Sequence, residues 1–211
     1  MNEPLPRGPT PDVAGDRREP LRIANCSGFL GDRLSAAREM VEGGPIDFLT
    51  GDYLAELTML ILWKARAKDP GAGYATTFLK QMEQVLGTCI DRRIRVVANA
   101  GGLAPAALAE KVRELAERLG IRARVAHVEG DDLLPRRAEL EARGVRFAHA
   151  ETGQPLAAAG VEPITANAYL GGWGIAAALA SGADVVICPR VTDASVVVGP
   201  AAWHFGWARD D

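Results

Sequence analysis

Short runs of β-forming residues alternate with helical patterns along most of this chain. Strands are expected over residues 21–25, 46–49, 94–98, 123–128, 164–168 and 184–188. Helical patterns lie over residues 33–42, 54–67, 74–90, 105–119, 136–143 and 175–181. Such alternation is typical of a mostly parallel sheet with right-handed crossovers. We therefore predict an α/β fold, a three-layer, Rossmann-like sheet flanked by helices. A partial β/α barrel is the alternative, because it would present the same strand ends.

Two segments allow more detailed expectations. The helix over residues 54–67 is apolar nearly all round in its first half, which is typical of a helix buried on several sides. The same apolar surface could support a homo-oligomer interface. Residues 196–198 are expected to continue into a helix or turn that Gly199 and Pro200 end. Residues 144–162 have a mixed pattern that predicts no single element.

The chain length of 211 residues suits one domain with a hydrophobic core. Residues 1–20 place prolines among charged residues, so we expect a disordered leader before an ordered domain over residues 21–211. The net charge of −3, without a basic face, argues against nucleic acid as a partner. No signal peptide and no membrane-spanning apolar run is evident, and three widely spaced cysteines fit a reducing compartment. We therefore expect a cytoplasmic protein that does not contact a membrane.

Small and polar residues follow the expected strands, where parallel sheets bind their ligands. Free backbone N–H groups in the glycine-rich turns could bind phosphate or carboxylate. Each turn taken alone is better explained as a tight strand-to-helix connection that requires glycine. None of them matches a P-loop or a clean dinucleotide fingerprint. The turn residues that we assign to substrate binding are Ser27, Gly28, Gly101, Gly102 and Gly171.

Carboxylates also gather after the strands. Asp52, Glu129, Asp131, Asp132 and Asp193 could hold a divalent cation or perform acid–base chemistry. Each could instead cap a helix or turn, because a carboxylate accepts from free N–H groups. Capping is favoured for Asp132, whereas Asp52 and Asp193 lie inside denser polar motifs.

Three other residue types at strand ends have a functional and a structural reading. Asparagine amides could orient a carboxylate or simply satisfy the loop backbone. His127 is favoured as a buried, hydrogen-bonded strand histidine over a base, and no histidine spacing supports zinc, so no metal ligands are assigned. Cys26 and Cys188 are favoured as buried apolar filler over nucleophiles. The asparagines concerned are Asn25, Asn99 and Asn167.

Residues 190–195 form the densest polar motif, directly after a strand that reads as buried. Arg190 could form a fork onto a carboxylate or phosphate, and Asp193 could accept a proton. Thr192 and Ser195 add two hydroxyl groups. The alternative is an Arg190–Asp193 ion pair that braces a loop, with Thr192 as a helix N-cap. We favour the functional reading.

Several of these motifs, in this order, resemble the acyclic terpene utilisation family over residues 21–207. The family pattern has glycine where this chain has Pro189, and its members continue beyond residue 211. The resemblance therefore implies an N-terminal part whose C-terminal remainder is missing. The motifs are NCSGF at residues 25–29, GDR at 31–33, TGDYLAELTM at 50–59, NAGG at 99–102, HVEGDD at 127–132, NAYLG at 167–171 and RVTDAS at 190–195.

The resemblance implies a role in bacterial breakdown of citronellol- and geraniol-type terpenes and related branched acids as CoA thioesters. We expect an enzyme of hydratase or lyase type that acts on such a thioester or carboxylate. The alternatives are a non-catalytic acyl-CoA-binding or scaffold subunit, or an inactive fragment. A divalent cation and the CoA moiety are the candidate cofactors. Catalytic roles are assigned to Asp52, Asp193, Arg190 and Glu129, and substrate binding to Asn25, Asn99, Asn167, Thr192, Ser195 and the turn residues named above.

Overall fold

The computed structural model describes residues 19–210, so most of the leader expected over residues 1–20 lies outside it. Five parallel strands form one sheet in the order β1-β2-β3-β5-β4. The predicted α/β fold is confirmed. Four strands lie inside the predicted ranges, and β2 ends two residues beyond its predicted range of 46–49. The strands are β1 (Ile23–Asn25), β2 (Phe48–Gly51), β3 (Arg95–Ala98), β4 (Val125–His127) and β5 (Val185–Ile187).

Three helices cover one face of the sheet: α1 (Ala36–Glu42), α3 (Thr76–Asp91) and α4 (Pro105–Arg118). Their apolar residues recur at helical spacing, so each helix turns one stripe toward the strands. In α3 this stripe includes Phe78, Met82 and Val85, which are fully or almost fully buried. They pack with alternate strand residues such as Leu49 and Val96.

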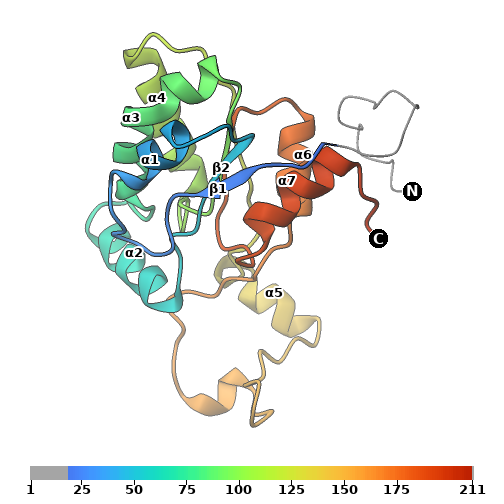
Figure 1. Cartoon of the computed structure of the whole chain (residues 1–211). Coiled ribbons are helices and arrows are strands. Elements are labelled where there is room, and N and C mark those ends of the chain that lie inside the picture. The colour runs from blue at the N-terminus through green and yellow to red at the C-terminus, as the bar shows by residue number, and fades with distance from the viewer. Residues whose placement is uncertain (1–18, 211) are drawn as a thin grey trace.

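Two helices, α6 (Trp173–Ala180) and α7 (Ser195–Phe205), cover the opposite face (Figure 1). They pack on the intervening strand residues, among them Phe48, Val97 and Val186. The strands are therefore apolar on both faces, as expected for a buried parallel sheet. This arrangement gives the predicted three layers, and the partial β/α barrel stays an alternative prediction.

Two predicted elements differ in the structure. Residues 164–168 form no strand but only an isolated bridge between Asn167 and Asp132. Their backbone bonds with the loop after β4, and Ile164 stays 43% exposed, so a strand there would gain no core contact. Helix α7 does not end at Gly199 and Pro200 but continues through them to Phe205. Both residues are buried, and α7 packs closely on α6, because a Cβ at position 199 would lie only 2.6 Å from the Cβ of Ile175.

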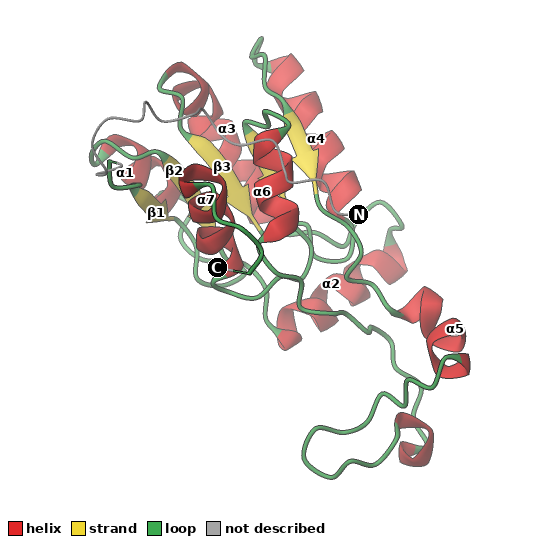
Figure 2. Ribbon diagram, turned by 90° about the vertical axis from the view of Figure 1, so that its right-hand side faces the viewer, coloured by secondary structure: helices red, strands yellow, loops and turns green. Residues whose placement is uncertain are grey.

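Helix α2 (Glu56–Lys68) is not buried on several sides, contrary to expectation. Its buried residues are Thr58, Met59 and Leu62, whereas Leu57 is 68% and Ile61 46% exposed. The reason is its position beyond the carboxyl ends of the strands (Figure 2), where Leu62 lies against the backbone at Gly102 and residues 19–210 cover only one side of the helix. The expected homo-oligomer stays a prediction.

The connection between β4 and α6 contains the 3₁₀ turns η1 (Leu134–Arg136) and η2 (Leu156–Ala159) and the short helix α5 (Arg137–Ala142). Figure 2 shows that this connection projects from the rest of the molecule. Residues 144–162 are exposed along most of their length and contain no regular element except η2. No helix within residues 19–210 is both long enough and apolar enough to cross a membrane.

Candidate functional site

The strand order creates a reversal between β3 and β5, which are hydrogen-bonded neighbours. The chain leaves β3 toward α4 on one face of the sheet and leaves β5 toward α7 on the other. Neighbouring strands that diverge in this way define the topological switch point of an α/β sheet, where such folds bind ligands. Residues 99–102 follow β3 and residues 188–190 follow β5, so both predicted motifs meet at this point.

Arg190 is the central residue of the site and is only 5% exposed. Its Nη2 donates to Glu56 Oε1 at 2.8 Å and to the hydroxyl of Tyr169. Tyr169 donates in turn to Glu56, and the Arg190 guanidinium carbon lies 4.4 Å from the centroid of the Tyr169 ring. The hydrogen bond from Tyr169 and the charge of Arg190 lower the pKa of Glu56. The arginine is thus held by a carboxylate at the start of α2 and an aromatic ring from the loop before α6.

One buried nitrogen of Arg190 has no hydrogen-bond partner within the described residues. Nη1 is buried and makes no hydrogen bond to any residue from 19 to 210. Arginine carries its charge at all ordinary pH values, and a buried charged donor without an acceptor costs free energy. An anion placed at Nη1 would remove that cost.

Asp131 holds the backbone of the same turn. It is 4% exposed, and its Oδ2 accepts from Asn167 Nδ2 at 2.8 Å and from the Arg190 backbone N–H at 3.2 Å. Burial raises the pKa of Asp131. Asp131 therefore joins Asn167 to the Arg190 turn.

Asp52 and Asn99 form a second pair, at the ends of β2 and β3. Asn99 is fully buried, accepts from the Tyr53 backbone N–H at 2.7 Å and donates to Asp52 Oδ1 at 2.5 Å. Asp52 also accepts from the Leu54 N–H at 3.3 Å. These contacts fix one carboxylate oxygen, while Oδ2 accepts no hydrogen bond from the described part of the chain. Asp52 is partly exposed, so that oxygen can meet a ligand.

The residues after β1 mostly bond with their own loop. Asn25 donates to the Ser27 carbonyl at 2.7 Å and accepts from Thr50 Oγ1 at 3.1 Å. The Ser27 hydroxyl donates to the Phe29 carbonyl at 3.0 Å. For Asn25 the structural reading, satisfaction of loop backbone, describes these contacts.

The predicted glycines differ in their surroundings. A Cβ on Gly101 would lie 2.6 Å from the Cys188 carbonyl oxygen, and Gly102 has a φ of +52° beside Leu62. Close approach of the β3 and β5 ends therefore requires glycine at position 101, whereas the positive φ and the contact with Leu62 of α2 require it at position 102. Gly28 and Gly171 have no atom within 4 Å of such a Cβ, so their predicted substrate contacts rest on the sequence alone.

The alternative interpretation of residues 190–195, a loop braced by an Arg190–Asp193 ion pair with Thr192 as the helix N-cap, does not describe the structure. Arg190 does not pair with Asp193, which is exposed and has no ion pair within residues 19–210, because Glu56 takes the guanidinium. Thr192 is not the N-cap of α7, which is Ala194. The Thr192 hydroxyl lies 2.5 Å from the Ser195 hydroxyl, which also donates to the Leu170 carbonyl.

His127 is predicted to be a buried, hydrogen-bonded strand histidine, and its burial is wrong: it lies exposed on the edge strand β4 and contacts the exposed Glu129 at 3.2 Å. Glu129 is therefore engaged away from the Arg190 network. Within the described chain no group of three or more His, Cys, Asp or Glu side chains could hold a metal ion. The predicted divalent cation thus has no such cluster to support it there.

Sequence reasoning missed two residues of the site, Glu56 and Tyr169. Both lie inside motifs that carry the family resemblance, four residues after Asp52 and two after Asn167. Glu56 and Tyr169 are 113 residues apart along the chain, so only the tertiary fold brings both of them to Arg190.

A hollow of about 320 Å³ lies beside this site, between α2 and the loop after β4. Its lining is largely apolar, with Trp63, Leu103 and Ile164 among its residues, and Arg66 and Asp132 add charge. Leu103 directly follows Gly102, and Asp132 directly follows Asp131. The hollow thus lies next to both halves of the polar site.

Comparison with curated proteins found no match, and comparison with solved structures found none either. A family model does match: the one described as "Acyclic terpene utilisation family protein AtuA" covers residues 21–211. That match includes all five strands and every residue of the Arg190 and Asp52 networks. On this match over nearly the whole described chain, the protein belongs to the acyclic terpene utilisation family AtuA.

Proposed function

We propose that the switch point binds the carboxylate or thioester end of a branched acyclic substrate in terpene breakdown. The buried, unpartnered Nη1 of Arg190 is the observation that carries this proposal. Guanidinium groups bind carboxylate and phosphate oxygens through paired N–H donors. Here Nη2 is used by Glu56 and Tyr169, whereas Nη1 is left for the ligand.

Substrate would reach Arg190 past Tyr169. The ring of Tyr169 lies over the guanidinium and is 51% exposed, so rotation of this side chain uncovers the arginine. The adjoining hollow of about 320 Å³ has the apolar walls that a branched hydrocarbon chain requires. An anionic head at Arg190 and an apolar tail in the hollow match the two parts of a terpenoid acid.

A hydratase or lyase step needs a group that takes a proton from water and returns one to carbon. Asp52 suits the first task, because Asn99 orients its carboxylate and leaves Oδ2 open. Asp193 and Glu129 stay as further candidates, and a divalent cation or the CoA moiety would enter with the substrate. The non-catalytic alternative, an acyl-CoA-binding subunit, uses the same Arg190 contact without proton transfer.

Binding is tested by thermal shift with geranoyl-CoA, citronellyl-CoA and the two free acids, each with and without Mg²⁺. A ligand at 100 times its Kd stabilises the folded state by about 2.7 kcal/mol, which is a readily measured shift. Arg190→Lys keeps the charge but removes the fork, so affinity should fall at least about tenfold, or about 1.4 kcal/mol. Arg118→Lys, at an exposed pair with Glu83, is the matched control.

Equal stabilisation of the Arg190→Lys variant and the wild type, or no response to any of the four compounds, contradicts the binding proposal. Catalysis is tested separately with Asp52→Asn, which should still bind substrate while product formation stops. A wild-type protein that binds a thioester and forms no product supports the subunit alternative.

A further inference from the structure

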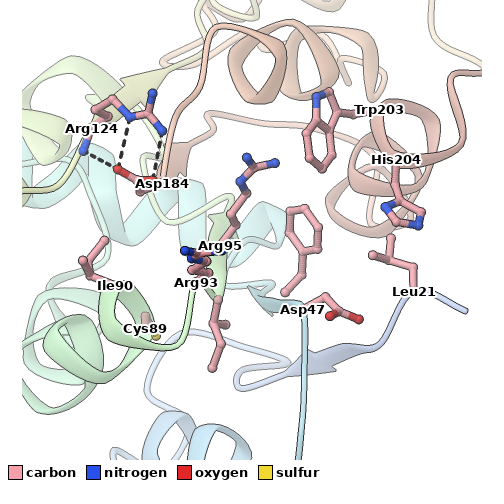
Figure 3. Close-up of a pocket in the computed structure, with 12 residues that line it drawn as sticks. Leu21, Asp47, Cys89, Ile90, Arg93, Arg95, Arg124, Asp184, Trp203 and His204 are labelled. Carbon is pink, nitrogen blue, oxygen red and sulfur yellow. Dashed lines mark hydrogen bonds and ion pairs between the residues drawn. The ribbon is translucent and has the colours of Figure 1, made fainter. Parts of the chain in front are cut away.

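A second hollow, of about 410 Å³, lies at the opposite end of the sheet, where the strands begin. It is formed by the starts of β2 and β3, the ends of α3 and α7, and the residues that precede β4 and β5 (Figure 3). None of the residues that line it belongs to the Arg190 or Asp52 networks. Its properties are therefore independent of the proposed function above.

The charges in this hollow are unbalanced. Asp47 and Asp184 are its two carboxylates, and each already accepts from an arginine: Asp47 from Arg22 at 2.8 Å and 3.2 Å, and Asp184 from Arg124 at 2.8 Å and 3.4 Å. Arg93 and Arg95 line the same hollow and make no side-chain hydrogen bond or ion pair to any residue between 19 and 210. Two guanidinium groups are thus left without an acceptor.

Arg95 is partly withdrawn from water at the first position of β3. Its guanidinium carbon lies 4.0 Å from the centroid of the Trp203 ring (Figure 3). The loss of water around it lowers the pKa of Arg95, although the charge of Asp184 works in the opposite direction. The Trp203 ring holds the guanidinium group in place through a cation–π contact, and its N–H donors, which bond to no residue from 19 to 210, can bind an anion.

Arg93 is held in a backbone conformation that arginine disfavours. Its φ is +58°, and it follows α3 at the position where helices usually end with glycine. The N–H groups of Arg93 and Ile94 bond back to the carbonyls of Ile90 and Cys89, which is the arrangement of that helix ending. Glycine would form the same turn without strain, so folding does not explain an arginine side chain here.

We propose that this hollow binds an organic anion, a phosphate or carboxylate group joined to an apolar body. Arg93 and Arg95 would bind the anionic group through their free N–H donors. The apolar body would pack on the aliphatic and aromatic lining, which includes Leu21, Phe48 and Ile94. The volume exceeds what an inorganic ion needs, which favours a ligand with such a body.

The test uses the full chain and isothermal titration at low salt with three probes: AMP, octanoate and inorganic phosphate. AMP or octanoate should bind saturably, and inorganic phosphate should bind at least tenfold more weakly than the better of the two. Tighter binding of AMP would indicate a phosphate ester as the natural ligand, and tighter binding of octanoate would indicate a fatty carboxylate. Absence of saturable binding by both organic probes overturns the proposal.

Arg93→Gly separates ligand binding from folding, because it relieves the strained turn. It should melt at the same or a higher temperature than the wild type and bind the better probe at least tenfold more weakly. Arg95→Gln should weaken binding to a similar extent, whereas Arg118→Gln, at an exposed pair with Glu83, should leave it unchanged. Unchanged affinity in a folded Arg93→Gly protein, or a loss caused equally by Arg118→Gln, contradicts the assignment.

Discussion

Burial decides the chemistry of the cysteine side chains. Cys26, Cys89 and Cys188 are at most 3% exposed, and burial raises the pKa of Cys26 to about 11 and that of Cys89 to about 12. The reactive form of cysteine is the thiolate, so at pH 8 on the order of one Cys26 in a thousand can react. We expect no measurable modification of the native protein by iodoacetamide at pH 8 within minutes, and three modified cysteines in urea. Mass spectrometry checks both results, and rapid native labelling of Cys26 or Cys188 would contradict the role of apolar filler.

Asp131 shows how a carboxylate can be structural and still destabilise the fold when charged. Asp131→Ala leaves the Asn167 amide and the Arg190 N–H without their acceptor, which should lower the free energy of unfolding by roughly 1–3 kcal/mol. Asp131→Asn keeps an acceptor oxygen in place and should cost less.

The pH dependence of stability tests the same residue. The pKa of Asp131 in the folded state is raised above its ordinary value of 3.8. The contribution of Asp131 to the free energy of unfolding is therefore fully present below pH 3.8 and is lost as the pH rises through the folded-state pKa. As the pH rises, the wild type should therefore lose stability relative to Asp131→Asn, because asparagine does not ionise. Urea unfolding at pH 4, 5 and 7 measures the difference, and parallel curves for the two proteins would contradict it.

The residues that the sequence could predict are those that directly follow a strand. Arg190, Asp52 and Asn99 are predictable because parallel strands align their carboxyl ends at one edge. Glu56 is not predictable in the same way, since its contact with Arg190 spans 134 residues and depends on where α2 crosses that edge. The alternative Arg190–Asp193 pair does not form for the same reason: Arg190 pairs with Glu56, a partner that only the fold supplies.

Helices α6 and α7 owe their close packing to two glycines. A Cβ on Gly172 would lie 2.8 Å from the Gly199 backbone nitrogen, so Gly172→Ala must push the helices apart. Overpacking of this kind should lower the free energy of unfolding by about 1–3 kcal/mol. Gly171→Ala is the matched control, because no atom lies within 4 Å of its Cβ. Thermal and urea unfolding should separate the two variants, and equal stabilities would show that the helices are not in close contact.

Periodicity predicts elements well where one face is apolar, as in α3 and α4, because burial follows the helical repeat directly. Periodicity fails where contacts with neighbouring elements determine which residues are buried or where a helix ends. The first half of α2 is apolar nearly all round, yet Leu57 and Ile61 are exposed because the described part of the chain covers α2 on one side only. In α7 the opposite holds, since packing on α6 keeps Pro200 inside a helix that its sequence would end.

At the scale of the whole molecule, the sequence predicts parallel strands but not their order. Hydrophobic runs are alike in all five strands, and nothing in them states that β5 inserts between β3 and β4. That insertion creates the switch point, since it makes neighbours of two strands whose helices lie on opposite faces. The position of the site therefore depends on the order of the strands. The local sequence predicts only which residue types follow each strand.

The position of β5 between β3 and β4 also predicts how the protein behaves when trypsin cleaves it. The connection between β4 and α6 projects from the molecule, and Arg143 and Arg146 are exposed within it (Figure 2). Among residues 19–210, trypsin should cut first at one of these two arginines, because few hydrogen bonds hold the segment. The fragment that contains β5 should stay bound to the rest, since β5 is hydrogen-bonded to β3 on one side and β4 on the other. Mass spectrometry of a digestion time course locates the first cut, and native size exclusion shows whether the fragments separate. Early cuts in α3 or α4, or separation of the fragments without denaturant, would mean that β5 is not held between its neighbours.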